Sequence, residues 1–216
     1  MEIRSMLWTI TLLLSLVGQV PQVHGQPAAK DLQPSHQAQL GLSLRVINLA
    51  GVPRHTLNRA ERETAALFHR FGVEVVWSYP EEDATNAALP TAGPGWPVYY
   101  LRVLRNQGYF AGSGLDKHAM GFAFSGRNLI HVFYECVKAE AKAGDLPEYL
   151  VFGIVVAHEL GHTLLPSGYH SPRGLMRARL MRSDWREALC GKLTFWDAEK
   201  TRVCESLILA ETRSQP

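Results

Sequence analysis

The segment LPEYLVFGIVVAHELGH, residues 146–162, decides how this chain folds. Pro147 and Glu148 suit the first turn of a helix, and the residues that follow are apolar on nearly every side. This pattern predicts a helix at the centre of the fold rather than on its surface. Imidazole and carboxylate groups at the end of such a helix are costly to bury unless a partner satisfies them.

The predicted helix ends in His158-Glu159-Leu160-Gly161-His162. Four residues make just over one helical turn, so the two imidazoles face the same way and can bind one metal ion, for which Zn²⁺ is the best match. Glu159 is rotated off that face, where its carboxylate could take a proton from water at the metal. An accidental match is the alternative, because average residue frequencies produce this pattern in roughly one chain in a hundred or two.

Residues beyond the helix support the metal hypothesis. Pro166-Ser167-Gly168 ends the helix and lets the chain double back toward it, which makes His170 the candidate third ligand. Gly174-Leu175-Met176-Arg177 follows as a tight segment entered by a glycine. The combination of these elements is much more specific than the pentapeptide alone.

The combination resembles the metzincin metalloproteases, whose extended motif is H-E-x-x-H-x-x-G-x-x-H followed by a turn that contains methionine. The likeness is greatest to small secreted bacterial members of that superfamily. It implies that His158, His162 and His170 bind zinc and that Glu159 is the general base. It also implies that Met176 lies beneath the metal site.

The chain departs from the family pattern at several positions. Leu165 replaces the glycine three residues after the second histidine, and His170 comes eight residues after that histidine rather than six. A wider turn at 166–168 would absorb the two extra residues. Ala178 stands where some relatives carry a tyrosine. Tyr169 and His118 are the candidates to stabilise an oxyanion in its place.

Other zinc patterns fit less well. A gluzincin site needs a helix-borne glutamate downstream, and the candidate is Glu187, within a segment that reads as an amphipathic turn, Ser183–Glu187. Several further histidines lack ligand spacing and are interpreted as surface or structurally satisfied residues: His36, His55, His69, His118 and His131.

The N-terminal residues 1–25 predict a secretory signal peptide. Arg4 precedes a run of about a dozen mostly apolar residues, short of the roughly 20 that span a bilayer. A cut is expected between Gly25 and Gln26. We therefore expect a secreted or periplasmic protein with no stable membrane insertion after cleavage.

The rest of the chain predicts one domain behind a short leader. Residues 26–40 are rich in Gln, Pro and Ala and predict a flexible segment. Residues 41–212 are expected to form a single metzincin-like catalytic domain of the α+β class. Its expected parts are a mixed twisted sheet of about four to five strands, a central zinc-binding helix and a C-terminal helix.

Hydrophobic periodicity places the individual elements. Strands are predicted at 42–49, 73–77, 98–104 and 128–133, with helices at 57–71, 135–143 and from near Thr194 onward. The first strand, helix and strand favour parallel pairing. Thr194 and Asp197 suggest a capping box. Residues 108–126 read as a long irregular loop.

Two interpretations of the predicted sheet and the cysteines stay open. By the family resemblance, Gly121–Ser125 or Leu129–Phe133 would hold extended substrate by strand addition, with an ordinary edge strand as the equal alternative. Export permits a disulfide, and Cys190 with Cys204 is the easiest pairing, which leaves Cys136 as a buried thiol.

Charge and composition point away from nucleic acid. The formal net charge is +2, and the arginines concentrate only after the third histidine, at Arg173, Arg177, Arg179 and Arg182. This cluster is interpreted as a solvated face, with an acidic substrate or partner as the alternative. We expect a monomeric zinc-dependent metallopeptidase, most simply an endopeptidase, that acts on a peptide or protein substrate. The alternative is a secreted binding module that contains zinc without turnover. Glu159 argues against that alternative, because a structural site has no use for a general base.

Overall fold

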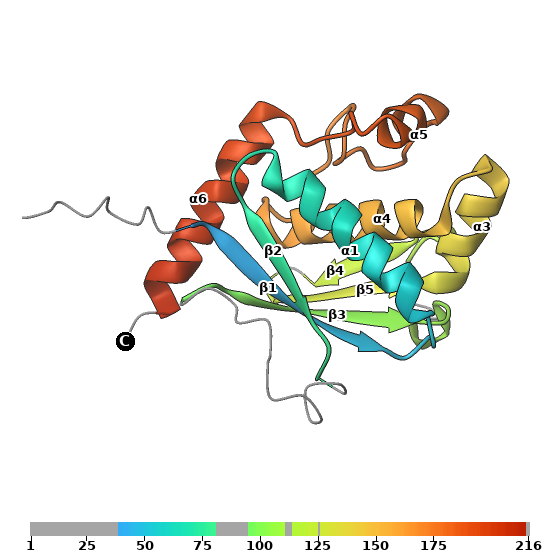
Figure 1. The fold of residues 1–216 in the computed structure, drawn as a ribbon, viewed down its shortest axis with the longest axis horizontal. Helices are drawn as coiled ribbons and strands as arrows, with labels where there is room; N and C mark the ends of the chain where they lie inside the picture. The colour runs from blue at the N-terminus through green and yellow to red at the C-terminus, as the bar shows by residue number, and fades with distance from the viewer. Residues whose placement is uncertain (1–38, 81–94, 111–113, 125, 215–216) are drawn as a thin grey trace, which may run out of the picture. The chain divides into compact units, whose positions relative to one another are not determined.

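A mixed five-stranded sheet carries the fold in the computed structural model, which describes residues 39–80, 95–110, 114–124 and 126–214 (Figure 1). The predicted signal peptide, 1–25, and residues 26–38 of the predicted flexible segment lie outside the described residues. The strands are β1 (Gly41–Asn48), β2 (Glu74–Ser78), β3 (Val98–Leu104), β4 (Gly121–Phe124) and β5 (Leu129–Phe133). Their order is β2-β1-β3-β5-β4, with parallel pairing throughout except between β4 and β5.

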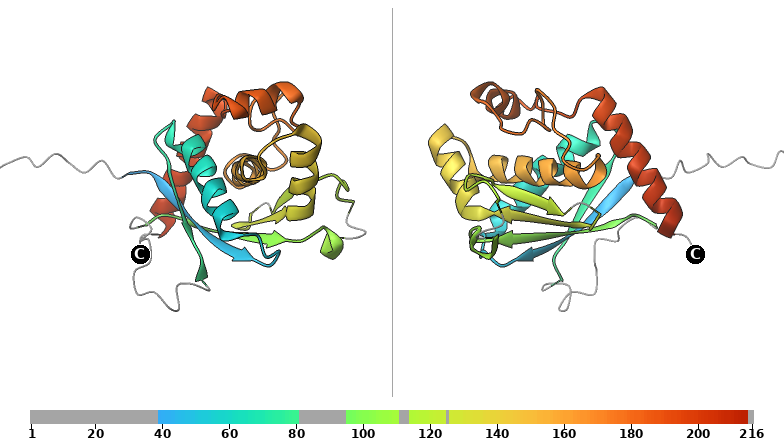
Figure 2. Two further views of the ribbon diagram at one scale, coloured as in Figure 1. Left: turned by 45° about the vertical axis from the view of Figure 1, so that its right-hand side comes forward. Right: turned by 180° about the vertical axis from the view of Figure 1, so that it is seen from behind.

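Five α-helices and one 3₁₀ turn complete the described chain. They are α1 (Arg54–His69), α3 (Tyr134–Gly144), α4 (Glu148–Leu164), α5 (Arg182–Leu189), α6 (Asp197–Ser214) and η1 (Gly108–Phe110). In Figure 2, α4 runs between α1 and α3 above the sheet, and the segment leading into α5 lies on its other side. The fold is therefore mixed α/β, with the predicted central and C-terminal helices both present.

The central position of α4 follows from its sequence. Residues 150–157 are all buried, as expected for a helix that is apolar all round. At Gly153 the helix meets α1 so closely that a Cβ there would lie 2.7 Å from the carbonyl oxygen of Ala60. Thr64 of α1 fills the contact by donating a hydrogen bond to the Gly153 carbonyl (2.9 Å). Pro147 caps the helix rather than entering it, so α4 begins one residue later than predicted.

The strand, helix and strand at the start of the domain pair in parallel as predicted. The long loop predicted at 108–126 is wrong in part, because it contains β4 and η1. Four residues that begin with glycine are too short to show a clear alternation, so periodicity did not predict this strand, although the family resemblance had made Gly121–Ser125 a candidate for pairing with substrate. Since β5 lies between β3 and β4, only β4 of the two substrate-strand candidates is at the edge of the sheet.

The C-terminal region corrects three further expectations. The predicted Thr194 and Asp197 capping box is not formed, because α6 starts at Asp197 and the backbone N–H of Trp196 donates to the carboxylate of Glu199 (2.7 Å). The stretch read as an amphipathic turn is the helix α5. The apolar pattern of the last helix, with Val203 and Leu207, also predicts a core position for Ile208, but its side chain is 52% exposed.

The three cysteines are free thiols, so the expected Cys190–Cys204 disulfide is not formed. Cys190 is exposed and Cys136 is only partly buried. Among the described residues, no helix is both long enough and apolar enough to cross a membrane.

Candidate metal centre

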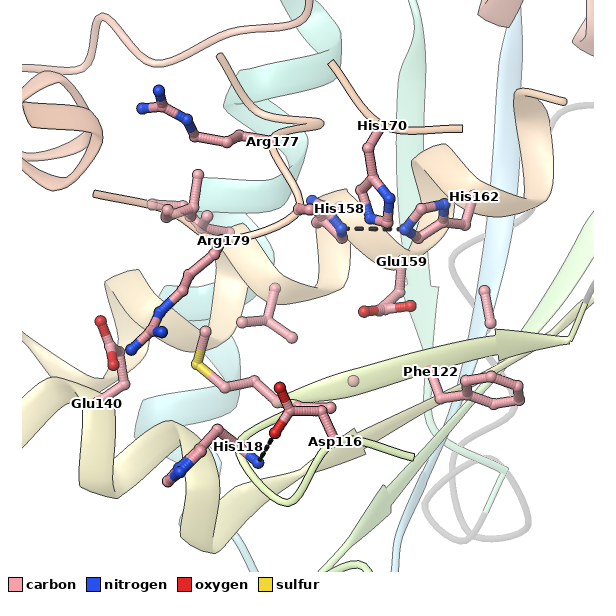
Figure 3. A pocket seen from close by; sticks show the side chains of 18 of the residues that line it. Asp116, His118, Phe122, Glu140, His158, Glu159, His162, His170, Arg177 and Arg179 are labelled. Carbon is pink, nitrogen blue, oxygen red and sulfur yellow. Dashed lines mark hydrogen bonds between the residues drawn. The ribbon is translucent and has the colours of Figure 1, made fainter. Parts of the chain in front are cut away.

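Three histidines converge at the C-terminal end of α4 (Figure 3). His158 and His162 come from successive turns of the helix, and His170 comes from the segment that follows it. Each offers one ring nitrogen, and these three atoms all lie within 4.8 Å of one another. The Nε2 atoms of His158 and His162 are 3.0 Å apart. The structure thus brings together the three residues that the sequence predicted as ligands.

A wide turn brings His170 back to the helix. Leu165 leaves α4 in an extended conformation while its N–H still donates to the Gly161 carbonyl (2.8 Å). The N–H of Tyr169 then donates to the Pro166 carbonyl (3.0 Å), and Gly168 adopts a positive φ of 71° within this turn. A glycine tolerates that backbone conformation without strain. This is the wider turn that was expected at 166–168.

A turn beneath α4 orients the first histidine. The carbonyl of Leu175 accepts a hydrogen bond from Nδ1 of His158 (2.8 Å). That bond fixes the tautomer in which Nε2 keeps its lone pair for a ligand. The turn is held from both sides, because the N–H of Leu175 donates to Thr194 (3.0 Å) and the N–H of Arg177 donates back to Gly174 (3.2 Å).

Met176 packs directly under the helix at this turn. Its side chain is fully buried, and a Cβ built on Gly161 would overlap its Sδ atom. Gly161 lies between the two helical histidines, so the glycine lets the methionine approach the backbone that carries them. The placement predicted for Met176, beneath the site, agrees with this packing.

All three imidazoles are biased toward the neutral form. Burial lowers the pKa of His158 to about 4, despite the opposing hydrogen bond to Leu175 and with a further lowering from His170. Burial, and then the neighbouring His158 and His170, lower the pKa of His162 to about 3. Burial also lowers the pKa of His170. Neutral imidazole is the form that binds a metal, so the site needs no proton release from these rings near pH 7.

Glu159 is the buried carboxylic acid of the site. It is 6% exposed, and burial raises its pKa to about 8. Its carboxylate lies in the cleft below the histidines (Figure 3). Gly121 of β4 faces it so closely that a Cβ there would lie 2.5 Å from Oε1. Sequence reasoning did not single out Gly121 for this role, because nothing local to β4 shows that α4 passes beside it.

The donor set fits a zinc ion. Tetrahedral zinc with Zn–N bonds of about 2.0–2.1 Å places its ligand nitrogens about 3.3 Å apart. The ring nitrogens here are separated by similar distances, from 3.0 Å for one pair to at most 4.8 Å. Three neutral nitrogens leave a fourth position for water or substrate, which is typical of catalytic rather than structural zinc sites.

A cleft of about 1120 Å³ surrounds the histidines and Glu159. Its walls are the segment 116–120, β4, α4, the end of α3 and parts of the chain between residues 167 and 185. His118 lines the cleft, whereas neither Tyr169 nor Glu187 does. Sequence reasoning missed two charged residues of the wall, Asp116 and Glu140. It also did not distinguish Arg179 from the other members of the arginine cluster.

Comparison of the sequence with known proteins finds no family model that matches and no similar protein among curated ones. The chemistry of the site therefore rests on its own residues. Those residues define a histidine triad with a buried acid in an open cleft.

Proposed function

We propose that this protein is an exported, zinc-dependent metallopeptidase of the metzincin type that acts as a monomer on peptides or proteins. The observation that carries the proposal is the buried Glu159 carboxylate beside three convergent neutral imidazoles in one cleft. Folding does not account for the buried acid, since a buried acid with a raised pKa makes a fold less stable at neutral pH. Strongly perturbed ionisable groups in a cleft are typical of catalytic sites.

Each group of the site has a role in peptide hydrolysis. His158, His162 and His170 would hold Zn²⁺, which supplies Lewis acidity toward a carbonyl oxygen and lowers the pKa of water. Glu159 accepts the proton of the attacking water and later returns it to the leaving amine. Burial raises the pKa of Glu159 and makes its carboxylate a stronger base than an exposed glutamate, and the positive charge of a bound zinc ion would favour the ionised form that takes the proton.

The edge of β4 suits an extended substrate. The Phe133 N–H donates to the Met120 carbonyl (2.8 Å), so the backbone groups of even-numbered residues along β4 point toward β5. The backbone groups of Gly121 and Ala123 then point away from β5, and both residues line the cleft. An extended peptide could therefore pair with this edge and present its backbone to Glu159.

The proposal is tested with quenched fluorescent peptides and the zinc-loaded mature chain. Glu159→Gln keeps the shape of the side chain and removes the base, and a loss of about 10²-fold or more in kcat with zinc retained is expected. Glu187→Gln is the matched control, because Glu187 lies outside the cleft and is the ligand of the gluzincin alternative. Full activity in Glu159→Gln contradicts the mechanism. Zinc bound by the parent with no hydrolysis of any peptide supports the binding module instead.

A further inference from the structure

The cleft extends from the histidines along α4 toward the helix N-terminus. Ile154 and Val155, which line this half, lie one helical turn before His158 and Glu159. Four residues advance about 6 Å along a helix, and an extended peptide advances about 3.3 Å per residue. Whatever occupies this half of the cleft is therefore within about two residues of the bond to be cleaved.

Most charged groups around this half already have partners within the protein. Arg177 pairs with the buried Asp184 (2.8 Å). The carboxylate of Glu140 accepts a hydrogen bond from Nε1 of Trp185 (2.9 Å). The carboxylate of Asp116 accepts the backbone N–H of His118. These contacts hold the groups in place and reduce their demand for a ligand.

Arg179 differs from these neighbours. Within the described parts of the chain it makes no ion pair and no hydrogen bond, and its side chain reaches into the cleft from the segment after Met176 (Figure 3). Glu140 stands opposite on α3, and the two form no ion pair. A guanidinium group carries donors in a planar fork that matches a carboxylate.

We propose that Arg179 selects substrates that carry a carboxylate within two residues of the cleaved bond, a preference that rests on the proposed peptidase function. The carboxylate belongs to an aspartate or glutamate side chain or to the C-terminus of a short peptide. Glu140 repels a carboxylate that passes beyond Arg179, so the bound group is confined to the side of the guanidinium that faces the histidines.

The test compares peptides that differ only by Glu against Gln, or Asp against Asn, at each of the four positions that flank the cleaved bond. A further pair differs by a free or an amidated C-terminus, which separates the two sources of the carboxylate. We expect a preference of about fivefold in kcat/KM for the acid at one position, as for a partly exposed charge pair. Arg179→Gln should remove this preference and Arg179→Glu should invert it.

Two variants control for charge. Arg186→Gln removes the same charge from α5 outside the cleft and should keep the preference of the parent. Glu140→Gln keeps an acceptor for Trp185 and should raise the preference. An equal preference in the parent and Arg179→Gln overturns the proposal, and so does an equal loss in Arg186→Gln.

Binding to the inactive Glu159→Gln chain gives a readout without turnover. Fluorescence anisotropy of the same labelled peptides should show the acid bound about fivefold more tightly than the amide, with no difference once Arg179→Gln is added. Failure of the proposed function appears separately, as a lack of Glu159-dependent cleavage of uncharged peptides by the parent. The binding ratio still decides the role of Arg179 in that case.

Discussion

The contact between Gly161 and Met176 predicts that Gly161→Ala destabilises the parent chain but stabilises a chain that lacks the Met176 side chain. In the parent, a Cβ at Gly161 overlaps Sδ of Met176 and lies 3.1 Å from the ring of Phe195. Overpacking of a tight core costs about 1–3 kcal/mol, whereas replacing glycine by alanine within a helix gains about 1 kcal/mol. Gly161→Ala should therefore destabilise the parent by about 1 kcal/mol.

Removing the methionine side chain reverses this balance. In a Met176→Ala background the main obstacle is gone, and the Phe195 ring can shift into the vacated space. The same Gly161→Ala change should then stabilise the chain by about 1 kcal/mol, which gives a coupling energy of about 2 kcal/mol. Met176→Ala alone should cost about 2–5 kcal/mol, because it leaves a cavity under α4.

The assay is urea unfolding of the metal-free chain, followed by circular dichroism, with a thermal midpoint that moves about 2–4 °C per kcal/mol. Gly153→Ala is the matched control on the same helix, because its Cβ would meet the backbone of Ala60 rather than a removable side chain. Its cost should be equal in both backgrounds. An equal cost for Gly161→Ala in both backgrounds refutes the packing of Met176 beneath the histidines.

Three further predictions follow from the site and its surroundings. Gly121→Ala places a Cβ 2.5 Å from Oε1 of Glu159, so peptide hydrolysis should fall more than about tenfold while zinc binding persists; unchanged kcat argues against the close approach of β4. Glu159→Gln should stabilise the metal-free chain at pH 7 by at most about 3 kcal/mol, because a raised folded-state pKa destabilises the fold as pH rises above the unfolded value near 4.5. This gain should vanish toward pH 4, and a gain that is constant with pH contradicts the burial of the acid. Asp184→Asn weakens the acceptor for Arg177 and for the Met181 N–H, so unfolding in urea should show a loss of about 1–3 kcal/mol; no loss contradicts the capping of α5.

The predictability of each element depends on how local its determinants are. The apolar run before His158 predicts α4 well, because burial on all sides is visible in consecutive residues. Helical spacing likewise predicts that His158 and His162 face the same way. The return of His170 was predicted from the breaker residues at 166–168, which act over a few positions.

Other features depend on contacts between distant segments. The role of Gly121 arises only because β4 passes beside Glu159, and a sequence shows no trace of that approach. The cap of α6 was misplaced because Thr194 and Asp197 match a local pattern, while Glu199 actually accepts the bond that begins the helix. Arg179 can be distinguished from Arg177 only when the structure shows that Asp184 forms an ion pair with Arg177.

The central claim is that the three histidines bind one zinc ion. Zinc stoichiometry can be measured by mass spectrometry on the purified mature chain, on His170→Ala and on His118→Ala, which removes a histidine that lines the cleft outside the triad. The account predicts one tightly held zinc in the parent and in His118→Ala, and zinc that is lost or loosened at least about tenfold in His170→Ala. A parent chain without zinc, or equal retention in His170→Ala and the parent, would contradict the account.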